Sequence, residues 1–310
     1  MKINILMSTY NGEKYLAQQI KSIQDQTLTD WKLLIRDDGS SDRTPQIIKE
    51  FVDIDSRIVF INENDRENFG VIKNFYTLVK HEVADFYFFS DQDDYWIPRK
   101  LEISIEEALK YNESEPLLVY TDLSIVNNQL EVLQESMIRY QSDHANTDLL
   151  SELTENSVTG GTSVINHCLA ELWTQSDNLL MHDWYLALIA AAKGKLAYID
   201  QPTELYRQHE ANVLGARTWS KRINSWINPS QSLKKYWWLI TSSQKQASYL
   251  LELDIDNFKK SMIESYVTLI EQPFLTRIEL LRKYGFKKNR PFHTFIFRTL
   301  IITKLGYRRK

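Results

Sequence analysis

The stretch Asp85-Phe86-Tyr87-Phe88-Phe89-Ser90-Asp91-Gln92-Asp93-Asp94, residues 85–94, runs from an aromatic segment directly into a cluster of three carboxylates. A short apolar run of this kind predicts a buried strand, which ends where the polar residues begin. Three carboxylates so close together repel one another, and they lower stability or take up protons unless a positive charge balances them. A divalent cation supplies that charge, and oxygen ligands suit Mg2+ or Mn2+. The alternative is a solvated acidic turn.

The segments before this stretch alternate between strand-like and helix-like patterns. Strands are predicted at residues 3–7, 31–35 and 57–62, and helices at 12–26, 44–51 and 71–81. Such alternation predicts an α/β fold with a mostly parallel central sheet and helices on both faces. Ligands bind beyond the carboxyl ends of the strands in sheets of this kind. Asn11, the pair Asp37-Asp38 and the acidic cluster all follow predicted strands, so we expect them at one edge.

The pattern continues more loosely after residue 110. Strands are predicted at 117–122, 163–165 and 196–199, and helices at 184–192, 234–251, 257–270 and 274–284. We therefore expect two parts, a catalytic α/β domain at 1–215 and a helical, basic and aromatic region at 216–310.

The composition is that of an ordinary globular chain of 310 residues, with 43% apolar and 25% charged residues. These fractions exclude a disordered chain, a collagen-like chain and a small disulfide scaffold. The single cysteine, Cys168, cannot form an internal disulfide or a zinc site of several thiolates, which fits a reducing compartment. Residues 3–6 are too short an apolar segment for a signal peptide, and no uninterrupted apolar run reaches ~18 residues. We therefore expect a cytoplasmic protein without a spanning helix.

The net charge of −4 conceals two regions of opposite sign. Residues 1–210 carry 18 basic and 35 acidic side chains, whereas residues 211–310 carry 19 and 6. Segments 217–222, 234–238 and 286–310 mix basic with aromatic residues, a composition typical of surfaces that bind anionic membranes. We therefore expect peripheral attachment to the inner face of the cell membrane. The alternatives are an ordinary helical subdomain or a homodimer contact. We expect no nucleic-acid partner, because the acidic half repels phosphate.

Two further segments follow predicted strands and suit a nucleotide. An aspartate in Asp37-Asp38-Gly39 is well placed to accept hydrogen bonds from a nucleobase or a ribose, although Asp-Gly is also a common turn. The segment Ser8–Asn11 brings hydroxyl groups to the start of a helix, where anions are favoured. The sequence contains no dinucleotide-binding glycine motif, no P-loop and no G-x-S-x-G elbow, which leaves a diphosphate nucleotide held through a metal.

These blocks, in this order, resemble the family-two nucleotide-sugar glycosyltransferases of the GT-A fold. The resemblance is carried by Ser8–Asn11, Ser22–Thr27, Asp37–Asp42, Asn68-x-Gly70 and Asp91-x-Asp93-Asp94. Segments 158–162, 180–184 and 205–215 further resemble the rhamnosyltransferase branch, which builds rhamnose-rich cell-wall polysaccharides in Gram-positive bacteria.

The resemblance implies roles for individual residues. Those implied to bind the donor nucleotide are Ser8, Thr9, Tyr10, Asn11, Asp38, Asp91 and Arg207. Those implied to contact the metal, Mn2+ or Mg2+, are Asp93, Asp91 and His209, with Asp94 as a substitute ligand. For His209 the alternative is a surface histidine.

Asp183 matches the catalytic base of the family. The broader family usually has Glu-Asp at this point, whereas His182 precedes the aspartate here. The alternative roles of Asp183 are a helix N-cap and an ion pair with His182. The chain also has Tyr206-Arg207-Gln208-His209 in place of the Q-x-x-R-W motif of processive synthases, which favours the addition of one or a few sugars.

The resemblance implies an inverting, metal-dependent glycosyltransferase that moves L-rhamnose from dTDP-β-L-rhamnose to a lipid-linked saccharide. One base suffices for a single displacement, whereas a glycosidase needs two carboxyl groups that flank the bond. The alternatives are transfer of glucose, galactose or an amino sugar from a UDP donor, and a membrane-docked scaffold that binds a nucleotide sugar without turnover.

Overall fold

The aromatic strand predicted at 85–89 is β4 (Phe86–Ser90), and it lies inside the sheet with every residue buried. The computed structural model describes residues 1–141, 144–208 and 229–308. These residues form one nine-stranded sheet in the order β3-β2-β1-β4-β8-β6-β9-β5, with β7 paired to β6. The other strands are β1 (Ile3–Thr9), β2 (Lys32–Asp37), β3 (Ile58–Phe60), β5 (Tyr95–Trp96), β6 (Leu117–Val126), β7 (Val132–Gln134), β8 (Ser163–Asn166) and β9 (Lys195–Arg207).

The first half of the sheet is parallel, as the alternating pattern predicts. β1 pairs in parallel with β2 and with β4, and β2 pairs in parallel with β3. In this register Thr9 lies opposite Asp37, and Met7 lies opposite Ser90. The segments that follow these three strands therefore emerge at the same edge of the sheet, which confirms the α/β fold expected from the sequence.

The second half of the sheet is mixed. β8 is antiparallel to both β4 and β6, and the short β5 is antiparallel to β9. β9 runs parallel to β6 over its whole length, with two register shifts near Asp122. The pairing of β5 with β9 brings the residues just after the acidic cluster against the end of β9, which carries Glu204 and Arg207.

Helices cover both faces of the sheet. They are α1 (Leu16–Gln24), α2 (Thr44–Ile54), α3 (Val71–His81), α4 (Lys100–Ala108), α5 (Met137–Gln141), α6 (Leu149–Thr154), α7 (His167–Leu172), α8 (His182–Lys193), α10 (Pro229–Ser248), α11 (Asn257–Thr268), α12 (Phe274–Tyr284) and α13 (Pro291–Thr303). Successive residues of a strand point to opposite faces. Ile5 accordingly packs in a core with α1, α2 and α4, whereas Leu6 packs in a core with α3 and α8.

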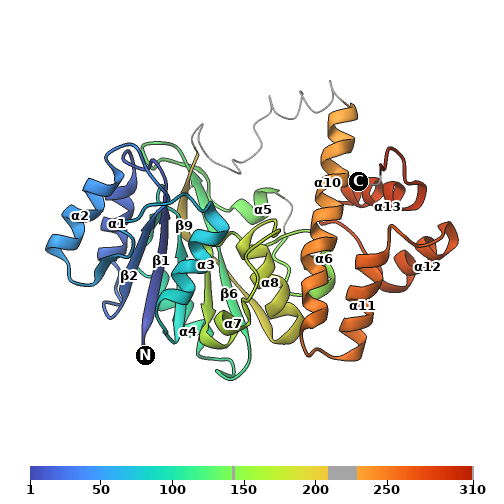
Figure 1. Ribbon diagram of the computed structural model, residues 1–310, viewed down its shortest axis with the longest axis horizontal. Coiled ribbons are helices and arrows are strands. Elements are labelled where there is room, and N and C mark those ends of the chain that lie inside the picture. Colours follow the sequence, from blue (N-terminus) through green and yellow to red (C-terminus); the bar gives the residue numbers. More distant parts are fainter. Residues whose placement is uncertain (142–143, 209–228, 309–310) are drawn as a thin grey trace.

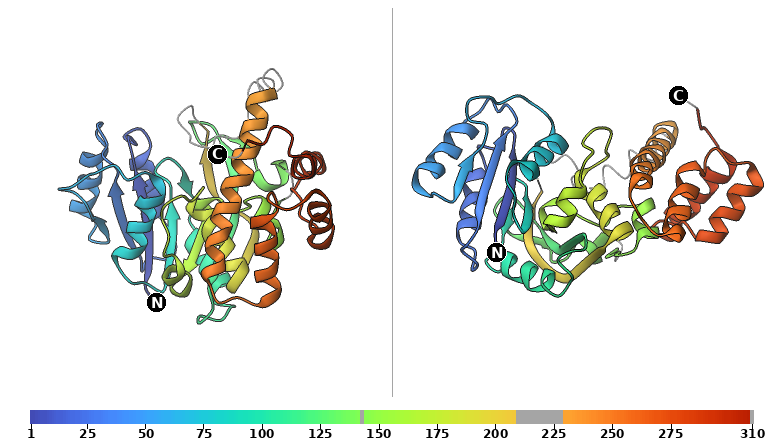
Figure 2. Two further views of the ribbon diagram at one scale, coloured as in Figure 1. Left: turned by 45° about the vertical axis from the view of Figure 1, so that its right-hand side comes forward. Right: turned by 60° about the horizontal axis from the view of Figure 1, so that its bottom comes forward.

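The C-terminal helices α10 to α13 form a layer at one end of the molecule (Figure 1). Figure 2 shows the same helices beside the sheet in two further views. Their core is continuous with that of the sheet, because Ile240 and Ile263 belong to the same buried cluster as Leu186 of α8. The expected boundary at 215/216 falls outside the described residues and stays a prediction. No helix of the part described here is both long and apolar enough to cross a membrane.

Candidate active site

The loop after β1 is fixed by side chains from the loops after β2 and β4. Gln92, the middle residue of the D-x-D segment, accepts a hydrogen bond from the Tyr10 amide and donates one to the Tyr10 carbonyl, both at 2.9 Å. The Asn11 amide donates to Ser40 Oγ at 2.9 Å. A Cβ atom at Gly12 would lie 2.2 Å from Gln92 Oε1, so a side chain there would displace the Gln92 amide. The three expected segments therefore meet, and Gln92 is a contact that the sequence motifs do not reveal.

Ser8 and Thr9 lie at the end of β1 and bond to neighbouring elements. Thr9 Oγ1 donates to Asp37 Oδ1 at 3.1 Å, and Ser8 Oγ accepts a hydrogen bond from Asn74 Nδ2 at 2.8 Å. Thr9 is buried and Tyr10 is exposed. Their predicted role in donor binding is consistent with their place at this edge, and it stays a prediction.

Asp38 organises the loop that precedes α3. Its carboxylate accepts hydrogen bonds from the amides of Phe69, at 2.6 Å, and Gly70, at 2.9 Å, and from Arg36 Nη1, at 3.1 Å. Gly70 has a φ of 77°, in the left-handed region that favours glycine, which explains the glycine of Asn68-x-Gly70. Both carboxylate oxygens of Asp38 thus already accept hydrogen bonds from groups of the protein, and nucleoside binding at Asp38 stays a prediction.

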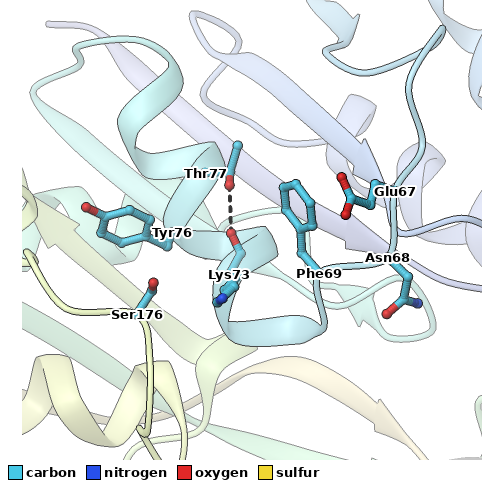
Figure 3. A pocket seen from close by; sticks show the side chains of 7 residues that line it. All are labelled: Glu67, Asn68, Phe69, Lys73, Tyr76, Thr77 and Ser176. Carbon is cyan, nitrogen blue, oxygen red and sulfur yellow. Dashed lines mark hydrogen bonds between the residues drawn. The ribbon is translucent and has the colours of Figure 1, made fainter.

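A pocket of about 400 Å3 is lined in part by this loop (Figure 3). Its walls come from the loop, from α3 and from the segment after α7, and they include Glu67, Phe69, Lys73, Tyr76 and Ser176. The ring of Phe69 is packed against the Arg36 guanidinium, 3.9 Å from its centroid. The lining of this pocket includes none of the residues predicted to bind the donor.

The three carboxylates after β4 differ in their surroundings. Asp91 is partly exposed, and burial of its carboxyl together with the nearby Asp93 raises its pKa to about 8. Asp94 is 1% exposed; one carboxylate oxygen accepts the Arg207 amide at 3.0 Å, and the other, Oδ2, has no hydrogen-bond partner. Burial and the charges of Glu204, Asp93 and Asp91 hold the pKa of Asp94 well above its usual range.

A buried ion pair lies beneath this acidic corner, which we define as Asp91, Asp93 and Asp94. Lys100 Nζ is 2.8 Å from Glu204 Oε2 and donates to the Gly161 carbonyl at 2.7 Å, and both side chains are fully buried. Lys100 also lies over the Trp96 ring, 4.7 Å from its centroid. Glu204 is the ion-pair partner of Lys100, and the charges of Asp94 and Asp91 also act on Lys100. The sequence motifs give no indication of either residue.

Arg207, the last residue of β9, forms hydrogen bonds to the acidic corner and to α1. Its Nε donates to the Asp93 carbonyl at 2.9 Å, its Nη1 to the Asn128 carbonyl at 2.7 Å, and its Nη2 to Gln18 Oε1 at 2.7 Å. The side chain is 1% exposed. Its contacts are those of a residue that positions the acidic loop, and direct binding of the donor by Arg207 stays a prediction.

Asp183 lies in the first turn of α8 and close to the corner. It is 7% exposed, and burial raises its pKa to about 7, although hydrogen bonds from the amides of Trp184 and Gly160 oppose that rise. Its charge in turn raises the pKa of Asp91. The Gly160 amide binds Asp183 and the Gly161 carbonyl binds Lys100, so the turn at 160–161 links Asp183 to the ion pair beneath the corner. The residue at the N-cap position is Met181, so the capping role is not seen.

His182 does not pair with Asp183 either. Its ring stacks on Trp173 and packs against Phe75 and Phe89, and neither ring nitrogen has a hydrogen-bond partner. Burial lowers the pKa of His182 to about 3, so the ring is neutral at physiological pH. The glycine pair 160–161 fits against this arrangement: a Cβ atom on Gly160 would lie 3.1 Å from His182 Nε2, and one on Gly161 would lie 2.6 Å from Glu204 Oε1.

The residues of the acidic corner fit a divalent cation in one specific way. The unpartnered Asp94 Oδ2 and the partly exposed Asp91 and Asp93 offer oxygen ligands, which hard cations prefer. Within the ranges that the structure describes, no group of three or more His, Cys, Asp or Glu side chains is arranged to hold a metal on its own. Magnesium is often bound by one or two carboxylates plus substrate phosphates, and the corner suits that mode. His209 lies outside the described residues.

Comparison with known proteins identifies relatives over most of the chain. The family model "Glycosyl transferase family 2" matches residues 4–146. A dTDP-rhamnosyl transferase, RfbG of Shigella flexneri, is 32% identical over 219 residues, which are 68% of this chain and 74% of the relative. The UDP-Glc:alpha-D-GlcNAc-diphosphoundecaprenol beta-1,3-glucosyltransferase WfgD of Escherichia coli is 36% identical over 126 residues, 41% of this chain and 47% of the relative.

Solved structures with the same fold cover the C-terminal helices as well. Residues 1–349 of S. aureus TarS in complex with UDP align with a TM-score of 0.59 and 15% identity, over 100% of this chain and 93% of that chain. The mannosyltransferase PcManGT from Pyrobaculum calidifontis, in complex with GDP-Man and Mn2+, aligns with a TM-score of 0.53 and 13% identity, over 98% and 84%. At these identities the likeness shows the fold.

Proposed function

Because the chain belongs to glycosyl transferase family 2, we propose that it transfers L-rhamnose from dTDP-β-L-rhamnose to a hydroxyl of a lipid-linked saccharide, with inversion at the anomeric carbon. The observation that carries the proposal is the buried carboxylate of Asp183 beside the acidic corner. This arrangement brings a proton acceptor next to a site suited to a metal-bound diphosphate. The name of the S. flexneri relative supports dTDP-rhamnose as the donor, and that of the E. coli relative supports a diphosphate-linked lipid acceptor.

Asp183 performs the proton transfer in this mechanism. An acceptor hydroxyl is a weak nucleophile, and a carboxylate within hydrogen-bond reach takes its proton as the new glycosidic bond forms. The pKa near 7 suits this task, because a base is most effective when its pKa lies near the working pH. His182 is neutral and therefore adds no charge beside the Asp183 carboxylate. The amides of Trp184 and Gly160 hold that carboxylate in place.

Asp91 and Asp93, with Asp94 Oδ2 behind them, would hold a divalent cation. Such a cation stabilises the negative charge that gathers on the departing nucleoside diphosphate. Gln92 and Arg207 keep the corner in shape, the first through Tyr10 and the second through the Asp93 carbonyl. The remaining segments at the edge, 8–11 and Asp38, bind the nucleoside in this proposal.

The donor is tested with a panel of nucleotide sugars. We expect purified enzyme with Mn2+ to release dTDP from dTDP-β-L-rhamnose faster than it releases UDP from UDP-glucose, UDP-galactose or UDP-N-acetylglucosamine. Coupled detection of the free nucleotide measures both rates on one scale. Preferential turnover of a UDP sugar would replace rhamnose by that sugar, and absence of turnover with every donor and acceptor would favour a scaffold.

The pH dependence of the reaction should follow the pKa of Asp183. Only the ionised carboxylate can accept a proton, so kcat/KM should rise with pH, about tenfold per unit below pH 7, and level off above it. Initial rates between pH 5.5 and 8.5 measure the profile, and circular dichroism at each pH shows that the fold is intact. A rate that is flat across this range would contradict the assignment.

We also propose that the C-terminal helices attach the enzyme reversibly to an anionic membrane surface. Trp238, Phe292 and Phe295 are more than half exposed, and the exposed Lys234 and Lys235 lie on the same helix as Trp238. Exposed aromatics and cations on neighbouring helices are typical of interfacial segments. The basic segment 217–222 lies outside the described residues.

A further inference from the structure

The C-terminal region contains a second cavity that the mechanism above does not use. It has a volume of about 750 Å3 and lies between Asn146, the segment 287–291 and one face of α13. Three cationic side chains, Lys287, Lys288 and Arg298, line it, and none of its described lining residues is a carboxylate. Its remaining walls are polar or apolar, with Asn289, Phe295 and Ile302 among them.

Hydrogen bonds hold residues 288–289, which line the cavity, against the end of α6. The Lys288 ammonium donates to the Thr154 carbonyl, and the Asn289 amide donates to Glu155 Oε2 at 2.8 Å. Arg298 caps the end of the preceding helix through the carbonyls of Phe286, at 2.9 Å, and Gly285, at 3.2 Å. Glu155 acts on Lys288 from outside the cavity, so the described lining residues keep a net positive charge.

Lys287 and Phe295 are free to meet a ligand. Lys287 is exposed, and no hydrogen bond or ion pair of its side chain with another described residue is seen. Phe295 is 69% exposed although its neighbour Phe297 is fully buried. A cation and an aromatic ring on the walls of one cavity fit a ligand that has an anionic group joined to an apolar chain.

The cavity is connected to the catalytic base by a short series of contacts. Asn146 Nδ2 donates to Asn289 Oδ1 and to Ser157 Oγ, both at 2.8 Å. Asn156 directly precedes Ser157, and its Nδ2 is 3.4 Å from Asp183 Oδ1. Asn146, Ser157 and Asn156 therefore link the wall of the cavity to Asp183.

We propose that this cavity, between Asn146, segment 287–291 and α13, binds the phosphate-bearing end of the acceptor, a prenyl-type phosphate or diphosphate that carries the saccharide. The proposal rests on the proposed function, since it assigns a place to the acceptor of that reaction. The cations bind the phosphate, Phe295 contacts the start of the apolar chain, and the saccharide extends toward Asp183. The C-terminal helices thus select the acceptor as well as attach the enzyme to the membrane.

Calorimetry with farnesyl diphosphate as a soluble probe tests this site. The wild type should bind farnesyl diphosphate, should bind pyrophosphate more weakly, and should not bind farnesol. Lys287→Glu should weaken the binding of farnesyl diphosphate and of pyrophosphate about tenfold, as expected for reversal of a charge at a phosphate contact. Lys287→Arg should bind both probes like the wild type. Phe295→Ser should weaken the binding of farnesyl diphosphate and leave that of pyrophosphate unchanged. Both side chains are exposed, so these variants should fold.

Lys260→Glu is the matched control, because Lys260 is an exposed lysine of α11 outside the cavity. Equal weakening by Lys260→Glu and Lys287→Glu would overturn the proposal, as would displacement of the probe by dTDP or absence of probe binding. If Lys287→Glu instead lowers binding to phosphatidylglycerol vesicles and leaves the soluble probe unaffected, the cavity binds membrane headgroups and the proposal is wrong. Hydrolysis of dTDP-β-L-rhamnose by the wild type, measured without acceptor, tests the proposed activity by itself, so failure of the cavity and failure of the proposed activity are separate results.

Discussion

Asp183→Asn is expected to lower kcat by a factor of about 10²–10⁴, while the affinity for dTDP stays unchanged. The amide has nearly the same shape as the carboxylate but cannot accept the acceptor's proton. Its surroundings favour an intact fold, because Asp183 is buried with a raised pKa and asparagine removes a charge that burial disfavours. Single-turnover rates and calorimetry with dTDP separate the loss of catalysis from a loss of binding.

Asp200→Asn provides the control for this measurement. Asp200 is an exposed carboxylate of β9 that forms an ion pair with Arg139, and its replacement should leave kcat unchanged. His182→Phe is a second useful comparison, because the ring lies among Phe75, Phe89 and Trp173 and neither nitrogen has a hydrogen-bond partner. Turnover by Asp183→Asn equal to that of the wild type would remove Asp183 from the mechanism.

Lys100→Met should destabilise the protein by about 3–5 kcal/mol, because it leaves the fully buried Glu204 without its ion-pair partner. The substitution also removes the hydrogen bond from Lys100 Nζ to the Gly161 carbonyl, which adds to the loss of stability. The charge of Asp91 also acts on Lys100, and the pKa of Asp91 is about 8, so the loss should be larger at pH 8 than at pH 6, where Asp91 is protonated. Urea unfolding followed by tryptophan fluorescence measures the free energy of unfolding.

The double variant Lys100→Met/Glu204→Gln tests the cause of this loss. Replacing both partners of a buried ion pair usually costs less than removing one. We therefore expect the double variant to recover a large part of the stability lost in Lys100→Met. If the double variant instead loses as much free energy of unfolding as the two single variants lose together, the two residues act independently.

The sequence predicts the first half of the fold well, for reasons visible in particular elements. β1, β2 and β4 are short apolar runs, and α3 has a regular apolar stripe, so the observed α3 has the expected bounds of 71–81. Parallel strands bring their carboxyl ends to one edge, and this rule alone places segment 8–11, Asp38 and the acidic corner together. Local patterns therefore suffice where chain order and spatial order agree.

The sequence does not predict contacts between residues that lie far apart in the chain. Lys100 and Glu204 are 104 positions apart, and each alone has the appearance of a surface charge. Helix α4 is short and mixes charged residues with the apolar residues of its buried face, and the sequence of α13 has the composition of an interfacial tail. In the structure one side of α13 is buried through Phe297, Leu300 and Ile301, and Phe295 stays exposed.

Binding of dTDP measured by calorimetry, with Mn2+ and then with EDTA, tests most directly whether the acidic corner shares a cation with the donor. The wild type should bind dTDP at least about tenfold more tightly with Mn2+, and Asp93→Asn should abolish that gain while binding in EDTA stays the same. Equal affinity of the wild type in Mn2+ and in EDTA would contradict a metal-bridged diphosphate at Asp91 and Asp93.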